Sequence, residues 1–486
     1  MMSMHRPPLS RDSVIRPMIR PMIRPTPADT PRFHDSADSP DAPPAAPPLS
    51  GIGPAFAVIW SITAGATFLQ VANGLLQILL PLRMDAAGMS IGEIGLVASG
   101  YGLGFAAGCM LVPLLVRHVG HIRAFASLAA ISAVVALGFT QAEELWSWIL
   151  LRTLSGMVLA GLFTVIDGWV SAGATAANRG RVVSLYMLCT KIALMLSPLA
   201  IGLGSIETDG LFMAIAALMC LSLIPVSATL SREPPAPRTI SLIIPTLFRK
   251  APSAVTGAFA VGLMNSSVIA IAPVYGIQVG LGATEAALLF LALQAGSLIL
   301  QWPMGWLSDR TDRRRVIAGL FAGTALACIG IVVASHVIVS HVALVPALII
   351  AFAIWGGMAL CIYAVCIAHA CDIIEADMIV PAISSLLVCW AAGGMFGPFL
   401  ATTLMAATGP QGLFVFCGVI ATTLAGFVTW RIRARERPPA QGGFVNLPAT
   451  SAGTAELSPR AHEDGVDGDG GAEDSTPPDA PPAKPA

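Results

Sequence analysis

The sequence is poor in charged residues. Only 11% of its 486 residues are charged and its mean hydropathy is +0.76, whereas soluble domains carry about 25% charged residues. This composition excludes an ordinary soluble domain and indicates a membrane protein. The formal net charge is −1, and the arginines cluster in loops and not on one face, so we expect no nucleic-acid partner.

Several signatures of enzymes and cofactor sites are missing. The sequence has no G-x-x-x-x-G-K-[ST] phosphate loop, which argues against ATP-driven pumping. It has neither H-E-x-x-H nor G-x-S-x-G, so we expect no enzyme activity. The nine cysteines show no CxxC spacing and are interpreted as small buried apolar residues. We therefore expect no cofactor and no metal. No apolar segment follows the first residues, so a cleaved signal peptide is not expected.

Long apolar segments fill the middle of the chain. Each is long enough to cross about 30 Å of hydrocarbon as a helix. The twelve predicted segments are 55–82, 91–116, 123–140, 146–171, 182–203, 210–230, 252–279, 284–307, 316–337, 342–369, 382–405 and 411–430. The fold class is therefore an all-α polytopic membrane protein. The Pro-rich ends, 1–50 and 433–486, are predicted to be disordered cytoplasmic tails.

Basic residues are distributed unequally between the predicted loops. One side carries Arg117, Arg123, Arg179, Arg181, Arg232, Arg238, Arg249, Lys250, Arg310, Arg313, Arg314 and Arg315. On the other side Arg83 stands among Asp85, Glu143, Glu144, Glu207 and Asp209. Because cytoplasmic loops carry the excess of Lys and Arg, both termini are predicted to be cytoplasmic.

The two halves of the apolar region match at a constant shift. Asn73 aligns with Asn265, 192 positions later (265 − 73). The same shift relates Pro81 to Pro273, Gly88 to Gly280, Glu93 to Glu285 and Gly104 to Gly296. We interpret this as a duplication. It predicts an N-terminal six-helix bundle at 51–230, a cytoplasmic linker at 231–250 and a C-terminal six-helix bundle at 251–432.

Three motifs resemble the major facilitator superfamily of transporters. The turn Gly305–Arg315 reads G-x-L-x-D-R-x-x-R-R, which is similar to the short-loop signature of that family. Arg152-x-x-x-Gly156 resembles its buried-arginine motif, often linked to proton coupling in exporters, and Gly393–Pro398 resembles its Gly-Pro helix-bending motif. Asp167, followed by Asn178-Arg179-Gly180-Arg181, resembles the YcaD-type branch of bacterial carriers.

The resemblance implies twelve helices in two pseudo-symmetric six-helix bundles, in a bacterial inner membrane. It also implies a monomeric carrier that works by alternating access, with a substrate site near the midplane. The implied cytoplasmic gate comprises Asp309, Arg310, Arg313, Arg314, Arg179 and Arg181. The implied helix-bending residues are Gly397, Pro398 and Pro198. Alanine at Asp309 or Arg313 is expected to slow transport and leave folding intact.

Few polar side chains interrupt the predicted helices. An ionisable group inside a membrane is a functional candidate by default, which singles out Arg152, Asp167 and Lys191. Asp167 could instead pair with Lys191, or hold Arg179 or Arg181 in the gate.

Amide side chains form a second set of candidates. Gln70, Asn73 and Gln77 share one helix face, and Asn265 and Gln278 mark a similar one. By the resemblance, Tyr363 and His369 join them as lining residues. Interhelical hydrogen bonds are the alternative reading for each of these residues.

The sequence thus predicts a secondary active transporter of a small organic solute, coupled to protons. Export is favoured by Arg152-x-x-x-Gly156. Uptake of a metabolite stays open, because Ser197-Pro198 stands where exporters carry a Gly-Pro motif in the fifth helix. A non-transporting membrane sensor or scaffold is the alternative from a different class.

Overall fold

The computed structural model describes residues 52–173, 179–227, 241–338 and 340–434. Within these ranges every regular element is a helix, and twelve helices are long and apolar enough to cross a membrane. They are α1 (Ile52–Ala86), α2 (Ile91–Val119), α3 (His121–Gly138), α4 (Leu145–Gly173), α5 (Arg179–Leu196), α6 (Gly210–Ser227), α8 (Pro252–Gln278), α9 (Ala283–Arg310), α10 (Arg313–Val337), α11 (His341–Cys371), α12 (Ile379–Thr408) and α13 (Gly412–Ala434). The predicted all-α polytopic fold with twelve spans is confirmed.

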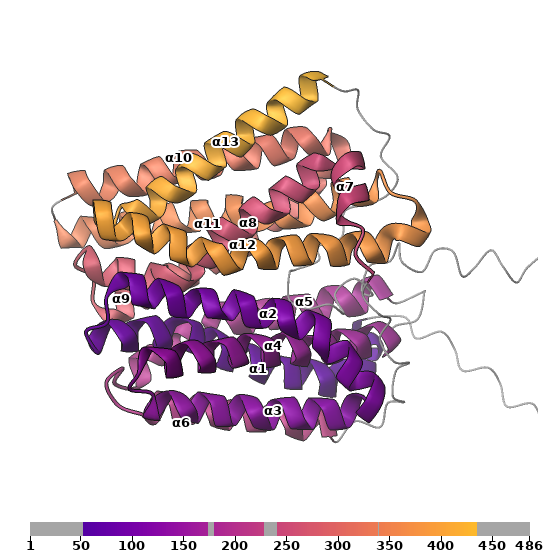
Figure 1. Ribbon diagram of the computed structural model, residues 1–486, viewed down its shortest axis with the longest axis horizontal. Helices are drawn as coiled ribbons and strands as arrows, with labels where there is room; N and C mark the ends of the chain where they lie inside the picture. Colours follow the sequence, from indigo (N-terminus) through magenta and orange to yellow (C-terminus); the bar gives the residue numbers. More distant parts are fainter. Residues whose placement is uncertain (1–51, 174–178, 228–240, 339, 435–486) are drawn as a thin grey trace, which may run out of the picture. The chain divides into compact units, whose positions relative to one another are not determined.

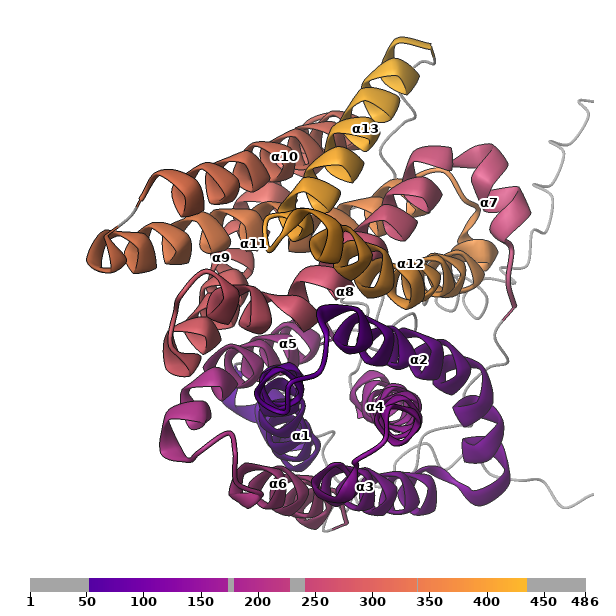
Figure 2. The ribbon, with the colours of Figure 1, turned by 60° about the vertical axis from the view of Figure 1, so that its left-hand side comes forward.

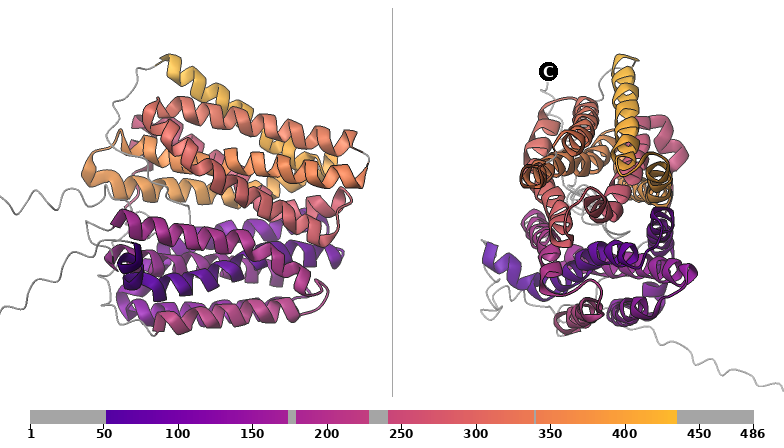
Figure 3. Two further views of the ribbon diagram at one scale, coloured as in Figure 1. Left: turned by 180° about the vertical axis from the view of Figure 1, so that it is seen from behind. Right: turned by 90° about the vertical axis from the view of Figure 1, so that its left-hand side faces the viewer.

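The helices run side by side in two groups (Figure 1). Helices α1–α6 pack on one another, as do α8–α13, and Figures 2 and 3 show the same grouping from other sides. The α2–α4 and α3–α6 contacts of the first group have equivalents in the α9–α11 and α10–α13 contacts of the second. This correspondence matches the repeat seen in the sequence.

The repeated residues build the same turn twice. Gly88 (φ 77°) and Gly280 (φ 95°) take a left-handed backbone conformation that favours glycine. Glu93 then accepts a hydrogen bond from the Ser90 backbone at 2.8 Å, and Glu285 accepts one from the Gly282 backbone at 2.9 Å. Each glutamate satisfies a backbone donor at the start of its helix, α2 or α9. The residues that repeat at a shift of 192 positions therefore form the same turn in both halves.

Two predicted boundaries differ from the structure. The segment predicted as one helix over 182–203 is α-helical only to Leu196 and continues as the 3₁₀ helix η2 (Ser197–Leu203), because Pro198 has no backbone N–H to donate. The predicted linker contains a short helix, α7 (Ile244–Lys250). The rest of that linker, up to residue 240, lies outside the described residues, as does nearly all of both predicted tails.

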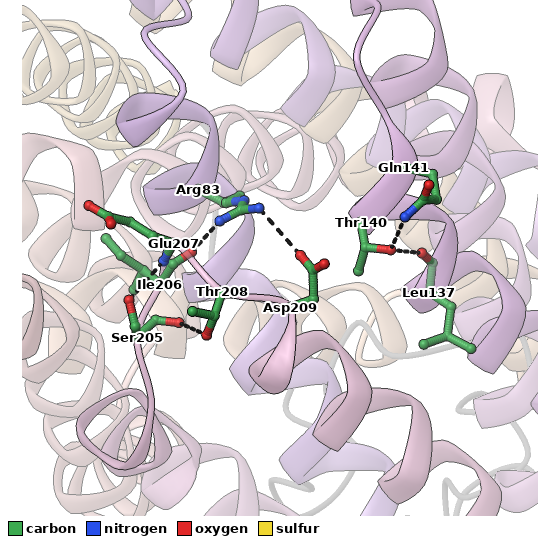
Figure 4. Close-up of polar contacts among 9 residues, drawn as sticks. All are labelled: Arg83, Leu137, Thr140, Gln141, Ser205, Ile206, Glu207, Thr208 and Asp209. Atoms are coloured by element: carbon green, nitrogen blue, oxygen red, sulfur yellow. Dashed lines mark hydrogen bonds and ion pairs between the residues drawn. The ribbon is translucent and has the colours of Figure 1, made fainter.

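The helix ends differ in charge. One end, which we call the arginine-rich end, carries Arg117, Arg181, Arg249 and the turn between α9 and α10; the opposite end carries Arg83. There Arg83 Nη2 lies 3.3 Å from Asp209 Oδ1, and Nη1 donates to the Ile206 carbonyl at 3.1 Å (Figure 4). The lone arginine predicted on this side thus joins the end of α1 to the start of α6.

Candidate functional site

A cavity of about 200 Å³ lies between the two helix groups. It is lined by the middle portions of helices from both groups; Asn265, for example, is the central residue of α8 (Pro252–Gln278). Its polar lining consists of Gln70, Asn73, Gln77, Lys191, Asn265 and Gln294. All of these except Gln294 were predicted from the sequence as candidate site residues. Asn73 Nδ2 donates to Gln70 Oε1 at 3.3 Å, as expected for side chains three positions apart on one helix face.

Aromatic side chains supply much of the remaining lining: Tyr101, Phe105, Phe163, Phe290, Tyr363 and Trp390. Tyr363 is the one that was predicted. Trp390 packs against both Phe105 and Tyr363, with ring centroids 5.4 and 6.4 Å apart, so it joins aromatic residues from the two groups. The cavity therefore offers flat apolar surfaces beside a small set of polar groups.

Arg152 lies behind the cavity wall and not on its surface. Its side chain is buried (3% exposed), and Nη2 donates to Gln77 Oε1 at 2.5 Å. Its guanidinium carbon lies 4.6 Å from the centre of the Tyr101 ring. Gly156, one turn along α4, packs against the α2 backbone beside Tyr101. This arginine thus orients two lining residues and brings α1, α2 and α4 together.

Lys191 reaches the cavity from α5. Its Nζ donates to Ser297 Oγ of α9 at 3.0 Å, so the bond joins the two helix groups. Asp167, its possible partner in the sequence analysis, does not line the cavity. The fully buried Asp167 carboxylate instead accepts a hydrogen bond from Tyr186 on α5 at 2.8 Å.

Two predicted lining residues lie elsewhere. Gln278 is the last residue of α8 and is exposed. His369 is buried near the arginine-rich end of α11. Both residues lie farther along their helices than the cavity does. At a rise of 1.5 Å per residue, Gln278 is about 20 Å along α8 from Asn265.

The turn between α9 and α10 is held by buried ion pairs. Arg313 Nε lies 2.6 Å from Asp372 Oδ2, and its Nη2 lies 3.3 Å from Asp309 Oδ1. Arg314 pairs with Asp312 at 2.8 Å. Although burial alone would raise it, hydrogen bonds from Arg314 hold the pKa of Asp312 below its usual value. These pairs connect α9, α10 and the segment after α11.

The other predicted gate residues are less engaged. Arg310 stacks on Trp306, with its guanidinium carbon 4.1 Å from the ring centre. Arg181 is exposed at the start of α5, and the side chain of Arg179 lies outside the described residues.

The most extensive contact between the two groups is made by α2 and α12, which run alongside each other (Figure 2). Phe399, which follows Pro398, donates its backbone N–H to Ser99 Oγ of α2 at 3.1 Å. A Cβ on Gly102 would lie 2.5 Å from the Met395 backbone nitrogen. Gly397 similarly packs against the α8 backbone. Of the three predicted helix-bending residues, Gly397 and Pro398 thus lie where α12 meets both α2 and α8, and Pro198 lies in η2.

Sequence reasoning missed Asp372, Ser297, Tyr101 and Trp390. Asp372 is the acid that binds Arg313 most closely, yet it belongs to no motif in the sequence. Gln294 could have been found, since it lies two residues before Gly296, which the repeat had already aligned with Gly104.

Comparison with known proteins agrees with this architecture. The model of the Major Facilitator Superfamily matches residues 62–372 and 254–461. The MFS-type transporter YcaD of Escherichia fergusonii is 24% identical over 363 residues, covering 74% of this chain and 92% of the relative. Its counterpart in Salmonella typhimurium is 24% identical over 362 residues, with the same coverage.

Solved structures share the fold at low sequence identity. The nucleoside transporter NupG aligns with a TM-score of 0.65 and 12% identity, covering 78% of this chain and 100% of that one. A D-xylose-proton symporter aligns with a TM-score of 0.61 and 13% identity, covering 79% and 98%. With a family model that matches most of its length, this multi-pass membrane protein belongs to the Major Facilitator Superfamily of transporters.

Proposed function

We propose that this protein moves a small organic solute across the bacterial inner membrane by alternating access, that it is coupled to protons, and that it works as an exporter. The cavity carries this proposal, because both helix groups contribute its polar and aromatic lining. A carrier that rocks two bundles around a fixed site needs a site of this kind, near the middle of the membrane.

Contacts between the bundles support alternating access. Near the opposite end, α9 packs on η2, and Gly95 of α2 packs against Thr402 of α12. Further along, Phe105 and Cys109 of α2 pack with Leu387 and Ala391 of α12. We infer that this is a state closed at the opposite end.

Asp167 supports proton coupling. It is an ionisable group in a membrane-spanning helix, and its helices α4 and α5 both line the cavity, through Phe163 and Lys191. Protonation of Asp167 would change its hydrogen bond with Tyr186, which joins α4 to α5. A proton can therefore alter how the two helices pack beside the solute.

Export is favoured by the arrangement around Arg152. The motif Arg152-x-x-x-Gly156, whose likeness to the exporter motif suggested this direction, has its arginine directly behind the cavity and its glycine against α2. Direction can be tested in a deletion strain. Sensitivity to toxic compounds supports export, whereas loss of growth on a single nutrient would indicate uptake.

The coupling can be tested in proteoliposomes that hold a pH-sensitive dye. Solutes from a metabolite panel are added outside, and proton movement and solute counterflow are both recorded. Wild type and Glu143→Gln, which changes an exposed acid at the opposite end, should show solute-dependent proton movement. Asp167→Asn should lose that movement and keep counterflow. Proton movement in Asp167→Asn would contradict this role of Asp167, and counterflow by no solute would contradict transport.

The remaining parts of the proposal are a monomeric state and two cytoplasmic termini. The arginine distribution supports the orientation. Fusions at either terminus should give a fluorescent cytoplasmic reporter and an inactive periplasmic phosphatase, and light scattering in detergent should give the mass of one chain. A phosphatase active at either terminus would reverse the orientation.

A further inference from the structure

We propose that the solute is a small amphipathic organic anion and that Lys191 binds its negatively charged group. The transport of this anion rests on the function proposed above. Binding of the anion does not, and can be tested separately.

Lys191 provides the charge. Among the described lining residues it is the one charged side chain, and no carboxylate lines the cavity. Its described partner is the neutral hydroxyl of Ser297. An ammonium group held inside a membrane is costly unless it is paired with an opposite charge or faces water. The cavity therefore favours an anion that takes the place of Ser297 beside Lys191.

Arg152 strengthens this preference without binding the solute. Its Nη2 donates to Gln77 and its guanidinium faces the Tyr101 ring, behind the lining, while Nε has no hydrogen-bond partner among the described residues. It adds a second positive charge in direct contact with two residues that line the cavity, Gln77 and Tyr101. A cationic solute would meet two like charges, and a neutral solute would leave Lys191 without a counter-ion.

The aromatic lining and the volume describe the rest of the solute. Phe105, Phe290 and Trp390 offer apolar surfaces on which a flat body can pack. The cavity volume of about 200 Å³ is below the range of about 300–1,000 Å³ that holds drug-sized ligands. A small monoanion with an aromatic body matches the charge of Lys191, the aromatic lining and the volume of the cavity.

The test uses three probes of similar shape and different charge: benzoate, benzamide and benzylamine. Their binding to the purified full-length protein in nanodiscs is measured by ligand-observed NMR titration. We expect benzoate to bind about tenfold or more tightly than either other probe, because a charge-assisted hydrogen bond is the strong contact here. Equal or tighter binding of benzamide or benzylamine overturns the proposal, as does absence of benzoate binding.

Lysine variants locate the contact. Lys191→Met should lose the preference for benzoate and keep its affinity for benzamide, and Lys191→Arg should restore part of the preference. The matched control is Lys250→Met, which removes a lysine of α7 that pairs with Glu375 outside the cavity, and it should behave as wild type. Unchanged benzoate binding by Lys191→Met overturns the proposal. If that variant fails to fold, the three probes on the wild-type protein still decide.

The result separates this inference from the transport function. Charge-selective binding without counterflow would refute transport and uphold the anion site. Counterflow of neutral solutes that Lys191→Met leaves unchanged would refute the anion site and uphold transport.

Discussion

Arg313 contacts two carboxylates whose contributions to stability should differ widely. Asp372 lies 2.6 Å from Nε and its side chain is 5% exposed, whereas Asp309 lies 3.3 Å from Nη2 and is 38% exposed. The guanidinium itself is 4% exposed. We therefore expect Asp372→Ala to lower the free energy of unfolding far more than Asp309→Ala.

Burial sets the magnitude. Removing one partner of a buried ion pair costs about 3–5 kcal/mol, because the remaining charge is left in a poorly solvated place. An exposed pair contributes about 0.2–1 kcal/mol. Arg313→Ala leaves the carboxylate of Asp372 buried without its arginine. From this burial we expect the variant to be destabilised, whereas the resemblance alone implies normal folding. The double variant Arg313→Ala/Asp372→Ala should lose less than the sum of the single variants, since it leaves neither charge behind.

The assay is unfolding of the purified protein by SDS in mixed micelles, followed by circular dichroism, with solute counterflow measured in parallel. Asp309→Ala should unfold nearly as wild type does, so that any loss of transport reflects the gate and not the fold. An Asp309→Ala loss equal to that of Asp372→Ala would refute the reasoning from burial. Strict additivity in the double variant would refute the direct pairing.

Three further predictions concern stability, each read as the thermal unfolding midpoint. Gly104→Ala places a Cβ against the Thr153 carbonyl of α4, so it should destabilise the protein by about 1–3 kcal/mol. The control Gly330→Ala, where the Cβ enters open space, should be neutral or stabilising. An equal loss of stability in both variants would contradict the close approach of α2 and α4 at Gly104. The lowered pKa of Asp312 means that its charge stabilises the folded state above its unfolded pKa and that this contribution is lost as pH falls through the folded pKa. The loss of stability in Asp312→Asn relative to wild type should therefore become smaller between neutral pH and about pH 3. A loss that stays constant with pH would rule out the charge of Asp312 as its source. Gln77→Leu removes the acceptor of the Arg152 hydrogen bond and should lower the free energy of unfolding by about 1–3 kcal/mol. Gln77→Glu keeps an acceptor oxygen and should be more stable than Gln77→Leu. Equal stability of the two variants would show that this hydrogen bond does not stabilise the protein.

The fold could be predicted because the membrane constrains the sequence directly: spanning segments must be apolar, and arginines gather in the loops between them. Apolar length alone identified all twelve spans, and the repeat predicted equivalent turns at Gly88 and Gly280. Helix ends were harder to predict. At Pro198 the chain changes from an α-helix to a 3₁₀ helix, but the run of apolar residues continues, so η2 was predicted as part of one long helix.

The candidate site could be predicted only in part. Helical periodicity predicts which face a residue shares with its neighbours, and Gln70, Asn73 and Gln77 do line the cavity together. Periodicity is silent about depth, which is why Gln278 and His369 were grouped with them. Partners from distant helices cannot be read from one chain. Nothing local to Asp372 indicates that its carboxylate meets Arg313, 59 residues earlier.

The contact between α2 and α12 has a mechanical consequence. At Gly102 backbone meets backbone, and the polar contact described there is the single bond from Phe399 to Ser99. Where backbones meet, one helix can tilt against the other without a change of rotamer, whereas the ring contact of Phe105 with Trp390 elsewhere on this interface does interlock. We infer that Gly102 is a pivot for the alternating access proposed above, so bulky residues there should slow the turnover of the carrier more than they weaken its hold on a solute.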